Sequence, residues 1–289
     1  MMQAAPLTFL QKSVIIRNSK KQRIPEIYMY TECSWFSAEK IHESGQCFRW
    51  VKNADNTYSI PAYGLRLDIK EQPENILYLS CSESEYRDVW NAYLDMDFDY
   101  RNHAEKACRL VGSDYLTEAA RVSEGVRILR QELWETTVSF IISANNNIPR
   151  IRKILSALCD REDVLPSPDR LLTMGAERLR HMGTGYRDKY LINAAEFFLE
   201  RDVQSELHGL DYLSAKEYLM QIKGVGSKVA DCICLFSLGY KDAFPRDVHI
   251  KRIEAEHFEG RFPEELALGG AGVLQQYLFY YERAKDMQR

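Results

Sequence analysis

The spacing of hydrophobic residues changes character about a third of the way along the chain. Residues 13–82 contain short β-rich runs separated by Pro, Gly and Asn, and we expect an antiparallel sheet from SVIIRN, EIYMY, QCFRWVKN, TYSIPAYG and NILYLSCS. From about Glu83 onwards, apolar residues recur every three or four positions, which is typical of amphipathic helices. The pattern predicts an α+β protein, with a sheet domain over residues 1–124 and a helical domain over residues 125–289.

One of the predicted helices covers residues 128–144, with the sequence ILRQELWETTVSFIISA. It is followed by three consecutive asparagines at positions 145–147. Asparagine tolerates the left-handed backbone conformation with which many helices end. The triple asparagine therefore predicts the end of this helix.

A helix–hairpin–helix is predicted to begin at Ser214. Ser214 and Glu217 have the spacing of a capping box, and Gly224 is expected to end the first helix. Gly224 and Gly226 enclose a tight turn, and Ser227 is expected to cap the second helix. Backbone N–H groups at such a turn can bind a phosphate oxygen, although the same tripeptide is equally compatible with a purely structural turn.

Two ionisable residues stand near predicted helix N-termini in this region. Lys228 lies in the first turn of the second helix, where the helix dipole disfavours an ammonium group and should help to lower its pKa. A nucleophilic amine needs such an environment, whereas an ordinary surface lysine would extend into solvent. Asp247 precedes the apolar run 248–253 and is expected to cap a helix, which favours its ionised form. Capping and a catalytic role for this carboxylate are compatible.

The overall charge argues against a generally basic surface, because the 289-residue chain has a formal net charge of -4 and a pI near 5.9. A nucleic-acid partner would need a local patch. Residues 223–252 provide a candidate, with six Lys or Arg against three Asp. The acidic stretch DMDFDY around Asp95 must then face away from nucleic acid or take part in a contact between domains.

The seven cysteines are scattered, form no C-x-x-C pair, and none follows Cys234. This excludes the usual ligand sets of zinc and of a four-cysteine iron–sulfur cluster, so we expect neither a metal nor another cofactor. The sequence contains no secretory signal pattern and no apolar run long enough to span a membrane. A cytoplasmic prokaryotic location is expected, or a nuclear one in a eukaryote.

Several motifs resemble those of one family across nearly the whole chain. They are GVGSKVADCICLFSL, FPRDVH, GQCFRW, GVRILRQ, FIISANNNIPRI, MGTGYRDKY and AGVLQQYLF. This set resembles the eukaryotic-type 8-oxoguanine DNA glycosylases of the helix–hairpin–helix GPD superfamily. The resemblance implies a sheet domain like that of the TATA-binding protein. It also implies an enzyme, acting as a monomer, that removes 8-oxoguanine opposite cytosine from duplex DNA and then cleaves the strand.

The resemblance also assigns roles to individual residues. Lys228 would attack C1′ of the damaged nucleotide and form a Schiff base, while Asp247 would stabilise the positive charge that develops on the sugar. The flipped base would be received by the Gly45 carbonyl, which accepts from N7–H of the lesion, and by Gln275 at the base edge. The two faces of the base would be enclosed by Cys232 and Phe279.

The remaining matches concern the DNA around the lesion. Asn145 and Tyr186 would fill the gap in the base stack, and Arg150 and Arg187 would read the unpaired cytosine. A backbone phosphate would be approached by Gly224, Gly226 and His249. Without the resemblance, these arginines would be read as surface residues and the histidine as a structural one. Cys232 and Phe279 would similarly be read as helix core.

Two alternatives remain at this point. One is a glycosylase of the same superfamily with another substrate, although several such enzymes carry the C-terminal cluster cysteines or lack a lysine at the position of Lys228. The other is a noncatalytic helix–hairpin–helix DNA-binding protein, which would need the glycine turn but neither Lys228 nor Asp247.

Overall fold

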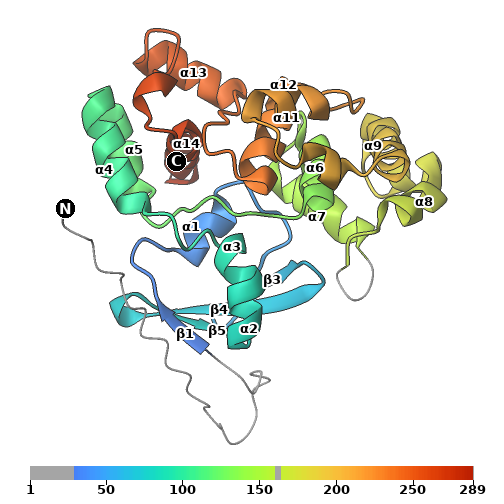
Figure 1. Ribbon diagram of the computed structural model, residues 1–289, viewed down its shortest axis with the longest axis horizontal. Coiled ribbons are helices and arrows are strands. Elements are labelled where there is room, and N and C mark those ends of the chain that lie inside the picture. Colours follow the sequence, from blue (N-terminus) through green and yellow to red (C-terminus); the bar gives the residue numbers. More distant parts are fainter. Residues whose placement is uncertain (1–28, 160–163, 289) are drawn as a thin grey trace, which may run out of the picture.

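The computed structural model describes residues 29–159 and 164–288 (Figure 1). Five strands form one antiparallel sheet in the order β1-β5-β4-β3-β2. The strands are β1 (Met29–Glu32), β2 (Val51–Lys52), β3 (Tyr58–Ala62), β4 (Leu65–Gln72) and β5 (Ile76–Leu79). The α+β prediction and the order of its two parts are thereby confirmed.

The helices are numbered along the chain, and they account for most of the residues after β5. Those in the first third are α1 (Ala38–Glu43), α2 (Glu83–Glu85), α3 (Asn91–Tyr93), α4 (Tyr100–Val111) and α5 (Asp114–Val122). Those that follow are α6 (Leu133–Ser143), α7 (Ile148–Leu158), α8 (Pro168–His181), α9 (Asp188–Glu200), α10 (Val203–Leu207), α11 (Tyr212–Leu219), α12 (Ser227–Ile233), α13 (Val248–His257) and α14 (Ala271–Gln288). Short 3-10 or π segments are η1 (Pro73–Asn75), η2 (Tyr86–Trp90), η3 (Gly185–Arg187), η4 (Cys234–Leu238) and η5 (Glu264–Leu266).

The sheet differs in several places from the expected strands. The run SVIIRN lies outside the described residues, and QCFRWVKN contributes only the two residues of β2. The helix α1 and the longest strand, β4, were not predicted at all. In β4, Leu67 and Ile69 face the core while Asp68 and Lys70 face away. This alternation of buried and less buried side chains is typical of a strand, but the charged residues made the strand difficult to recognise in the sequence.

Helix α6 begins five residues later than expected. The backbone N–H groups of the preceding residues donate to other parts of the fold instead of forming helical hydrogen bonds. Leu129 N–H donates to Gln46 Oε1, Arg130 N–H to the Tyr93 carbonyl and Gln131 N–H to the Phe236 carbonyl. The helix ends at Ser143, and Asn145 has a φ of 50°. The predicted stop at the triple asparagine is therefore confirmed.

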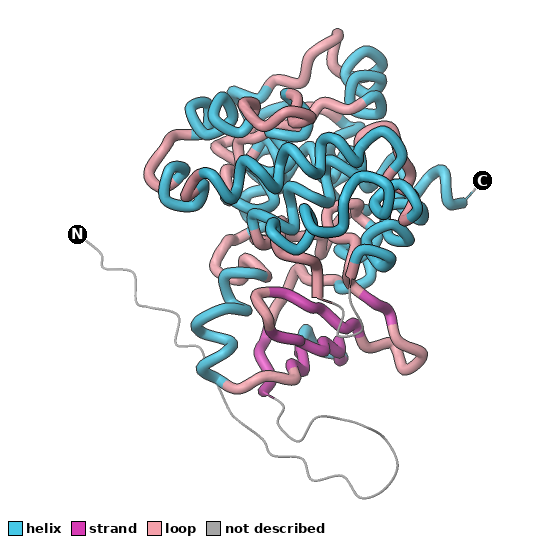
Figure 2. The backbone as a smooth tube through the Cα atoms, turned by 90° about the vertical axis from the view of Figure 1, so that its right-hand side faces the viewer, coloured by secondary structure: helices cyan, strands magenta, loops and turns pink. Residues whose placement is uncertain are grey.

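Two hydrophobic cores lie one above the other, with the sheet at one end of the molecule and the helices above it (Figure 2). Helices α4 and α5 belong to the helical core, where α5 packs along α14. The division at residue 124 stays a prediction. Within the described residues, no helix is long and apolar enough to cross a membrane.

The acidic stretch around Asp95 forms part of the contact between the two cores. Asp95 is buried, and its carboxylate forms an ion pair with Lys241 at 3.0 Å and accepts from the Tyr100 hydroxyl at 2.6 Å. The buried Arg127 guanidinium donates to the Asp95 carbonyl at 2.7 Å and to the Trp35 carbonyl at 2.9 Å. The stretch was expected either to face away from nucleic acid or to take part in a contact between domains, and the second expectation describes Asp95.

Candidate active site

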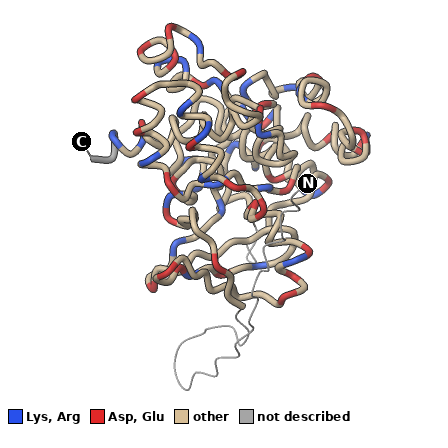
Figure 3. The backbone as a smooth tube through the Cα atoms, turned by 60° about the vertical axis from the view of Figure 1, so that its left-hand side comes forward, with Lys and Arg blue, Asp and Glu red and all other residues tan. Residues whose placement is uncertain are grey.

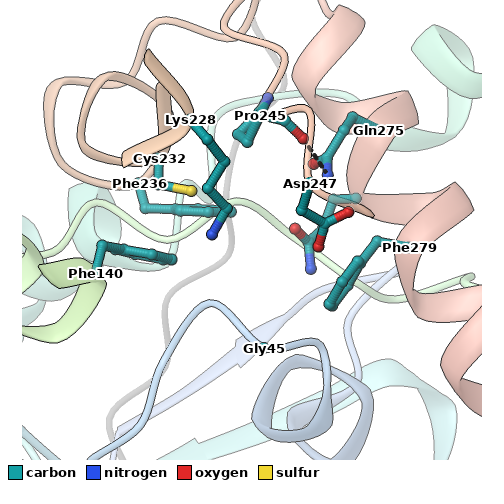
Figure 4. Close-up of a pocket in the computed structure, with 10 residues that line it drawn as sticks. Gly45, Phe140, Lys228, Cys232, Phe236, Pro245, Asp247, Gln275 and Phe279 are labelled. Carbon is teal, nitrogen blue, oxygen red and sulfur yellow. Dashed lines mark hydrogen bonds between the residues drawn. The ribbon is translucent and has the colours of Figure 1, made fainter. Parts of the chain in front are cut away.

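A pocket forms where α12, the loop before α13, and α14 meet the loop between α1 and β2 (Figure 4). The structure brings together all six residues that the sequence assigned to catalysis and base recognition, although they come from distant parts of the chain. The pocket is lined by Gly45, Phe140, Lys228, Cys232, Phe236, Pro245, Asp247, Gln275, Gln276 and Phe279.

Lys228 lies in the first turn of α12, as expected, but the helix starts differently. Gly226 is the N-cap and has no side chain, while Ser227 is the first helical residue, so the predicted Ser227 cap is wrong. The predicted capping box of the preceding helix is also wrong. Asp211 caps α11, and its carboxylate accepts from the N–H of Ser214 at 2.8 Å.

The Lys228 amine extends into the pocket beside aromatic and sulfur groups. Its Nζ lies 5.2 Å from the centroid of the Phe140 ring. Burial raises the pKa of the Cys232 thiol to about 11, although the nearby Lys228 ammonium acts in the opposite direction. At neutral pH, Cys232 is therefore a neutral group and no competing thiolate nucleophile.

Asp247 caps α13, and its carboxylate accepts from the Ile250 N–H at 2.9 Å. The predicted cap is confirmed. The carboxylate and the Lys228 amine line the same pocket from the N-termini of two different helices, as Figure 4 shows. A carboxyl group and an amine thus line the same pocket.

Gln275 supplies an unused hydrogen-bond acceptor. Its Nε2 donates to the Pro245 carbonyl at 3.2 Å. Its Oε1 is buried and has no hydrogen-bond partner among the described residues. An unpaired buried acceptor costs free energy, which a ligand that donates a hydrogen bond would recover.

Gly45 occupies a position that other residues would strain. Its φ is +78°, and a Cβ there would lie 3.0 Å from Cε1 of Phe279 and 3.2 Å from Cδ1 of Ile148. The Phe279 ring therefore packs directly against the Gly45 backbone. The centroid of the Phe279 ring also lies 6.0 Å from that of the His249 ring, in an edge-on arrangement.

Four pocket residues were not identified from the sequence. Phe140 and Phe236 stack with centroids 5.4 Å apart. Both lie within motifs that carry the resemblance, but their apolar helix pattern does not distinguish a pocket residue from a core residue. Pro245 and Gln276 lie within the motifs FPRDVH and AGVLQQYLF, close to the predicted site residues Asp247 and Gln275. This position was the signal from which they could have been identified.

The predicted wedge and opposite-base residues lie outside this pocket. Arg187 is only 3% exposed, and its guanidinium donates to the carbonyls of Ala144 and Asn145. It also lies 4.5 Å from the ring of Tyr186, which is 55% exposed. The structure thus places Asn145, Tyr186 and Arg187 together, whereas Arg150 is exposed in the first turn of α7. Their roles in binding DNA stay predictions.

The hairpin between α11 and α12 requires glycine at one position. Gly224 has a φ of +100°, and a Cβ there would lie 2.4 Å from the Tyr190 ring. Gly226 has an extended backbone, and nothing lies within 4 Å of its would-be Cβ. Its surroundings leave room for an approaching ligand, and phosphate binding here stays a prediction.

The positive excess predicted for residues 223–252 is reduced by ion pairs. Lys241 is paired with Asp95, Arg252 with Glu282, and Arg246 with two glutamates of its surroundings. Figure 3 shows acidic and basic positions interspersed over both parts of the molecule. Lys223, Lys228 and Lys251 form no ion pair with the described residues.

Comparison with known proteins gives two family matches that adjoin one another. Residues 30–137 match the N-terminal domain of 8-oxoguanine DNA glycosylase, and residues 138–260 match the HhH-GPD superfamily of base excision DNA repair proteins. A solved structure described as MBOgg1 in complex with a low affinity DNA ligand is 32% identical, with a TM-score of 0.79, over 96% of this chain and 100% of that chain. The chain belongs to the 8-oxoguanine DNA glycosylase family of the HhH-GPD superfamily.

Further relatives agree with this assignment. The apo 8-oxoguanine glycosylase/lyase of Clostridium acetobutylicum is 28% identical with a TM-score of 0.81, over 95% of this chain and 100% of that chain. The N-glycosylase/DNA lyase OGG1 of Arabidopsis thaliana is 27% identical over 87% of this chain and 73% of that protein. The N-glycosylase/DNA lyase of Saccharomyces cerevisiae is 37% identical over 47% of this chain, and the match spans 43% of the yeast protein.

Proposed function

We propose that this protein excises 8-oxoguanine paired with cytosine in duplex DNA and then cleaves the strand at the abasic site. The observation that carries the proposal is the pocket in which Lys228 and Asp247 meet the base-reading groups Gly45 and Gln275. The names of its relatives support it. One of them is the Clostridium acetobutylicum enzyme solved with double-stranded DNA containing cytosine opposite 8-oxoguanine.

The chemistry follows from the two helix N-termini. The Lys228 amine forms a bond to C1′ while the bond between C1′ and the base breaks, and the base leaves with the electron pair and takes up a proton. Positive charge develops on the sugar during this step, and the Asp247 carboxylate stabilises it. Opening of the sugar ring gives a Schiff base to Lys228. Loss of a C2′ proton and of the 3′ phosphate then cleaves the strand.

Recognition of the base uses groups that already line the pocket. Normal guanine presents an acceptor at N7, whereas 8-oxoguanine carries hydrogen there, so the Gly45 carbonyl favours the lesion. The free Oε1 of Gln275 accepts from an N–H group on the base edge. Cys232 and Phe279 enclose the two faces, and the neutral thiol of Cys232 adds no charge to the base.

The DNA around the flipped nucleotide is held by groups outside the pocket. In this proposal Asn145 and Tyr186 occupy the vacated stack, and Arg150 and Arg187 read the cytosine. Because the Arg187 guanidinium also holds the Asn145 carbonyl, one arginine couples the wedge to the reading of the opposite base. The protein acts as a monomer, and a DNA phosphate is bound by Gly224, Gly226 and His249.

Borohydride trapping on a duplex with 8-oxoguanine opposite cytosine tests the proposal. We expect a covalent protein–DNA adduct, and a Lys228→Gln variant should bind the duplex without excision or trapping. Excision by that variant would show that another group is the nucleophile. Binding by the wild-type protein without excision or trapping would instead indicate a noncatalytic DNA-binding protein.

Replacing the opposite cytosine by each of the other bases tests the two arginines separately. We expect excision to fall in every such duplex. In an Arg187→Ala variant, the preference for cytosine should decrease more than in an Arg150→Ala variant, because Arg187 also holds the Asn145 carbonyl. Equal excision opposite all four bases would rule out a reading role for both residues.

A further inference from the structure

The backbone on both sides of Gly45 is held by buried glutamine amides. The Ser44 carbonyl accepts a hydrogen bond from Nε2 of Gln276, and the Gln46 carbonyl accepts from Nε2 of Gln131 at 2.9 Å. Among the described residues, none donates to the carbonyl of Gly45. The one free carbonyl of this tripeptide thus belongs to the pocket-lining residue.

The residues on the two sides of Gly45 are held by different parts of the fold. On one side, Gln46 is fully buried and is tied to the segment before α6, because its Nε2 donates to the Arg127 carbonyl at 2.8 Å and its Oε1 accepts from the Leu129 N–H at 2.9 Å. On the other side, Gln276 reaches the Ser44 carbonyl from α14. The Ser44 carbonyl and the Gly45 N–H belong to one planar peptide group. The hydrogen bond to that oxygen therefore fixes the orientation of the peptide plane that precedes Gly45, whose φ is +78°.

Helix α14 also carries two of the residues proposed to contact the base, Gln275 and Phe279. Gln276 directly follows Gln275, and Phe279 packs against Gly45 from one turn further along. The hydrogen bond from Gln276 to the Ser44 carbonyl thus sets the position of Gly45 relative to Gln275 and Phe279. Gln276 is only 2% exposed, and a buried amide costs free energy unless it is hydrogen-bonded.

We propose that Gln276 is a positioning residue that sets the specificity of lesion recognition. By holding the Ser44 carbonyl, its amide keeps the Gly45 carbonyl directed at N7–H of the flipped base, without itself touching the reacting atoms. This inference rests on the proposed function, in which Gly45 distinguishes 8-oxoguanine from guanine.

Two full-length variants remove the donor while keeping the size of the side chain. Gln276→Met replaces it by an apolar chain of similar length, and Gln276→Glu places a second acceptor against the Ser44 carbonyl. Gln204→Met is the matched control, because Gln204 is an exposed glutamine. Each protein is assayed for excision of 8-oxoguanine opposite cytosine, and for cleavage of a duplex that already contains an abasic site.

The abasic duplex uses Lys228 and Asp247 but presents no base to read. We expect excision by Gln276→Met to fall by about tenfold, which corresponds to about 1.4 kcal/mol of transition-state stabilisation, while cleavage of the abasic duplex stays near the wild-type rate. Gln276→Glu should lose more excision than Gln276→Met. In a Lys228→Gln background, Gln276→Met should lower affinity for the 8-oxoguanine duplex but not for the guanine duplex.

Equal losses in both assays would overturn the inference, because they would show a general structural role. Unchanged excision by Gln276→Met would overturn it as well, and this variant decides the matter if Gln276→Glu does not fold. Failure of the proposed function is distinguishable, since it would appear in the wild-type protein itself as absence of excision.

Discussion

Asp247 has an observed role as a helix cap and a proposed role in catalysis, which substitution can separate. Its carboxylate caps α13 and, in the proposed mechanism, stabilises positive charge on the sugar. Asparagine caps helices about as well as aspartate but has no charge. We expect Asp247→Asn to lower the excision rate about a hundredfold with little change in the free energy of unfolding, whereas Asp247→Ala should also destabilise the fold by about 1 kcal/mol. Single-turnover excision and urea unfolding measure the two effects.

The outcome for Asp247→Asn decides which role matters for activity. If this variant excises 8-oxoguanine at the wild-type rate, the charge is dispensable and the cap alone accounts for the residue. A loss of stability equal to that of Asp247→Ala would show that the hydrogen bond to Ile250 needs the carboxylate.

At the residue scale, the proposed catalytic residues were easier to identify from the sequence than the aromatic residues that line the pocket. Lys228 and Asp247 could be proposed as catalytic residues because each stands at a helix start, where charge and dipole interact. Phe140 and Phe236 could not, because an aromatic residue in a pocket and one in a core follow the same apolar periodicity. The four base-pocket residues were recognised only through the family resemblance, since their local sequence does not distinguish them from ordinary turn or helix positions: Gly45, Cys232, Gln275 and Phe279.

At the scale of elements, the helix–hairpin–helix depends on how closely α9 approaches the turn. Gly224→Ala would place a methyl group against the Tyr190 ring at a backbone conformation that alanine rarely adopts. We expect a loss of roughly 2 kcal/mol in stability and weaker binding of undamaged duplex. Gly226→Ala is the matched control, because its Cβ meets open space. Thermal unfolding and binding by fluorescence anisotropy test both variants.

That prediction would be contradicted if Gly226→Ala and Gly224→Ala lost the same stability. The close approach of Tyr190 would then not be what restricts position 224. If duplex binding survived in a well-folded Gly224→Ala protein, the hairpin would not contact DNA through its backbone.

Glu282 joins three helices at the outer end of α14. Its carboxylate forms ion pairs with Arg252 of α13 and with Lys285, both at 2.8 Å, and accepts from the Tyr115 hydroxyl of α5. Burial alone would raise its pKa, but hydrogen bonds from Lys285 and Tyr115 and the charge of Arg252 outweigh burial and lower the pKa to about 2. The Glu282 carboxylate thus links α14, which carries Gln275, to α13, which Asp247 caps.

The pH dependence of this tie has a definite sign. An unfolded glutamate has a pKa of about 4.3, so the stabilisation is fully present above that pH and is lost as pH falls towards about 2. We expect the difference in unfolding free energy between wild type and Glu282→Gln to be largest near pH 6 and to shrink towards pH 3. Urea unfolding at several pH values measures it. A difference that is constant with pH would exclude this linkage.

The elements themselves were predicted with uneven success, for physical reasons. The helical character of the chain after Glu83 was predicted, whereas β4 was missed because charged residues alternate with its buried ones. The start of α6 was placed too early because an apolar segment can be buried without being helical. Its backbone hydrogen bonds go to Gln46, Tyr93 and Phe236, partners that no local pattern reveals.

At the scale of the whole molecule, the active site depends on how the two cores are held together. Gly45 comes from the sheet part, while Lys228, Asp247 and Gln275 come from the helical part. A small shift between the parts would separate the Gly45 carbonyl from Lys228, the proposed nucleophile. The Arg127 guanidinium and the ion pair between Asp95 and Lys241 cross this contact, so we expect these residues, which do not line the pocket, to influence its geometry.

The ion pair between Asp95 and Lys241 therefore gives a test of the coupling. The side chains are 9% and 14% exposed, and removing one partner leaves the other charge buried. We expect Lys241→Met to cost about 3 kcal/mol and to lower excision together with stability. The double variant Asp95→Asn/Lys241→Met should lose less, because asparagine can still accept from the Tyr100 hydroxyl without an unpaired charge. Urea unfolding of the wild type, Lys241→Met, Asp95→Asn and the double variant measures the coupling, and strictly additive losses would show that the pair does not act as a unit.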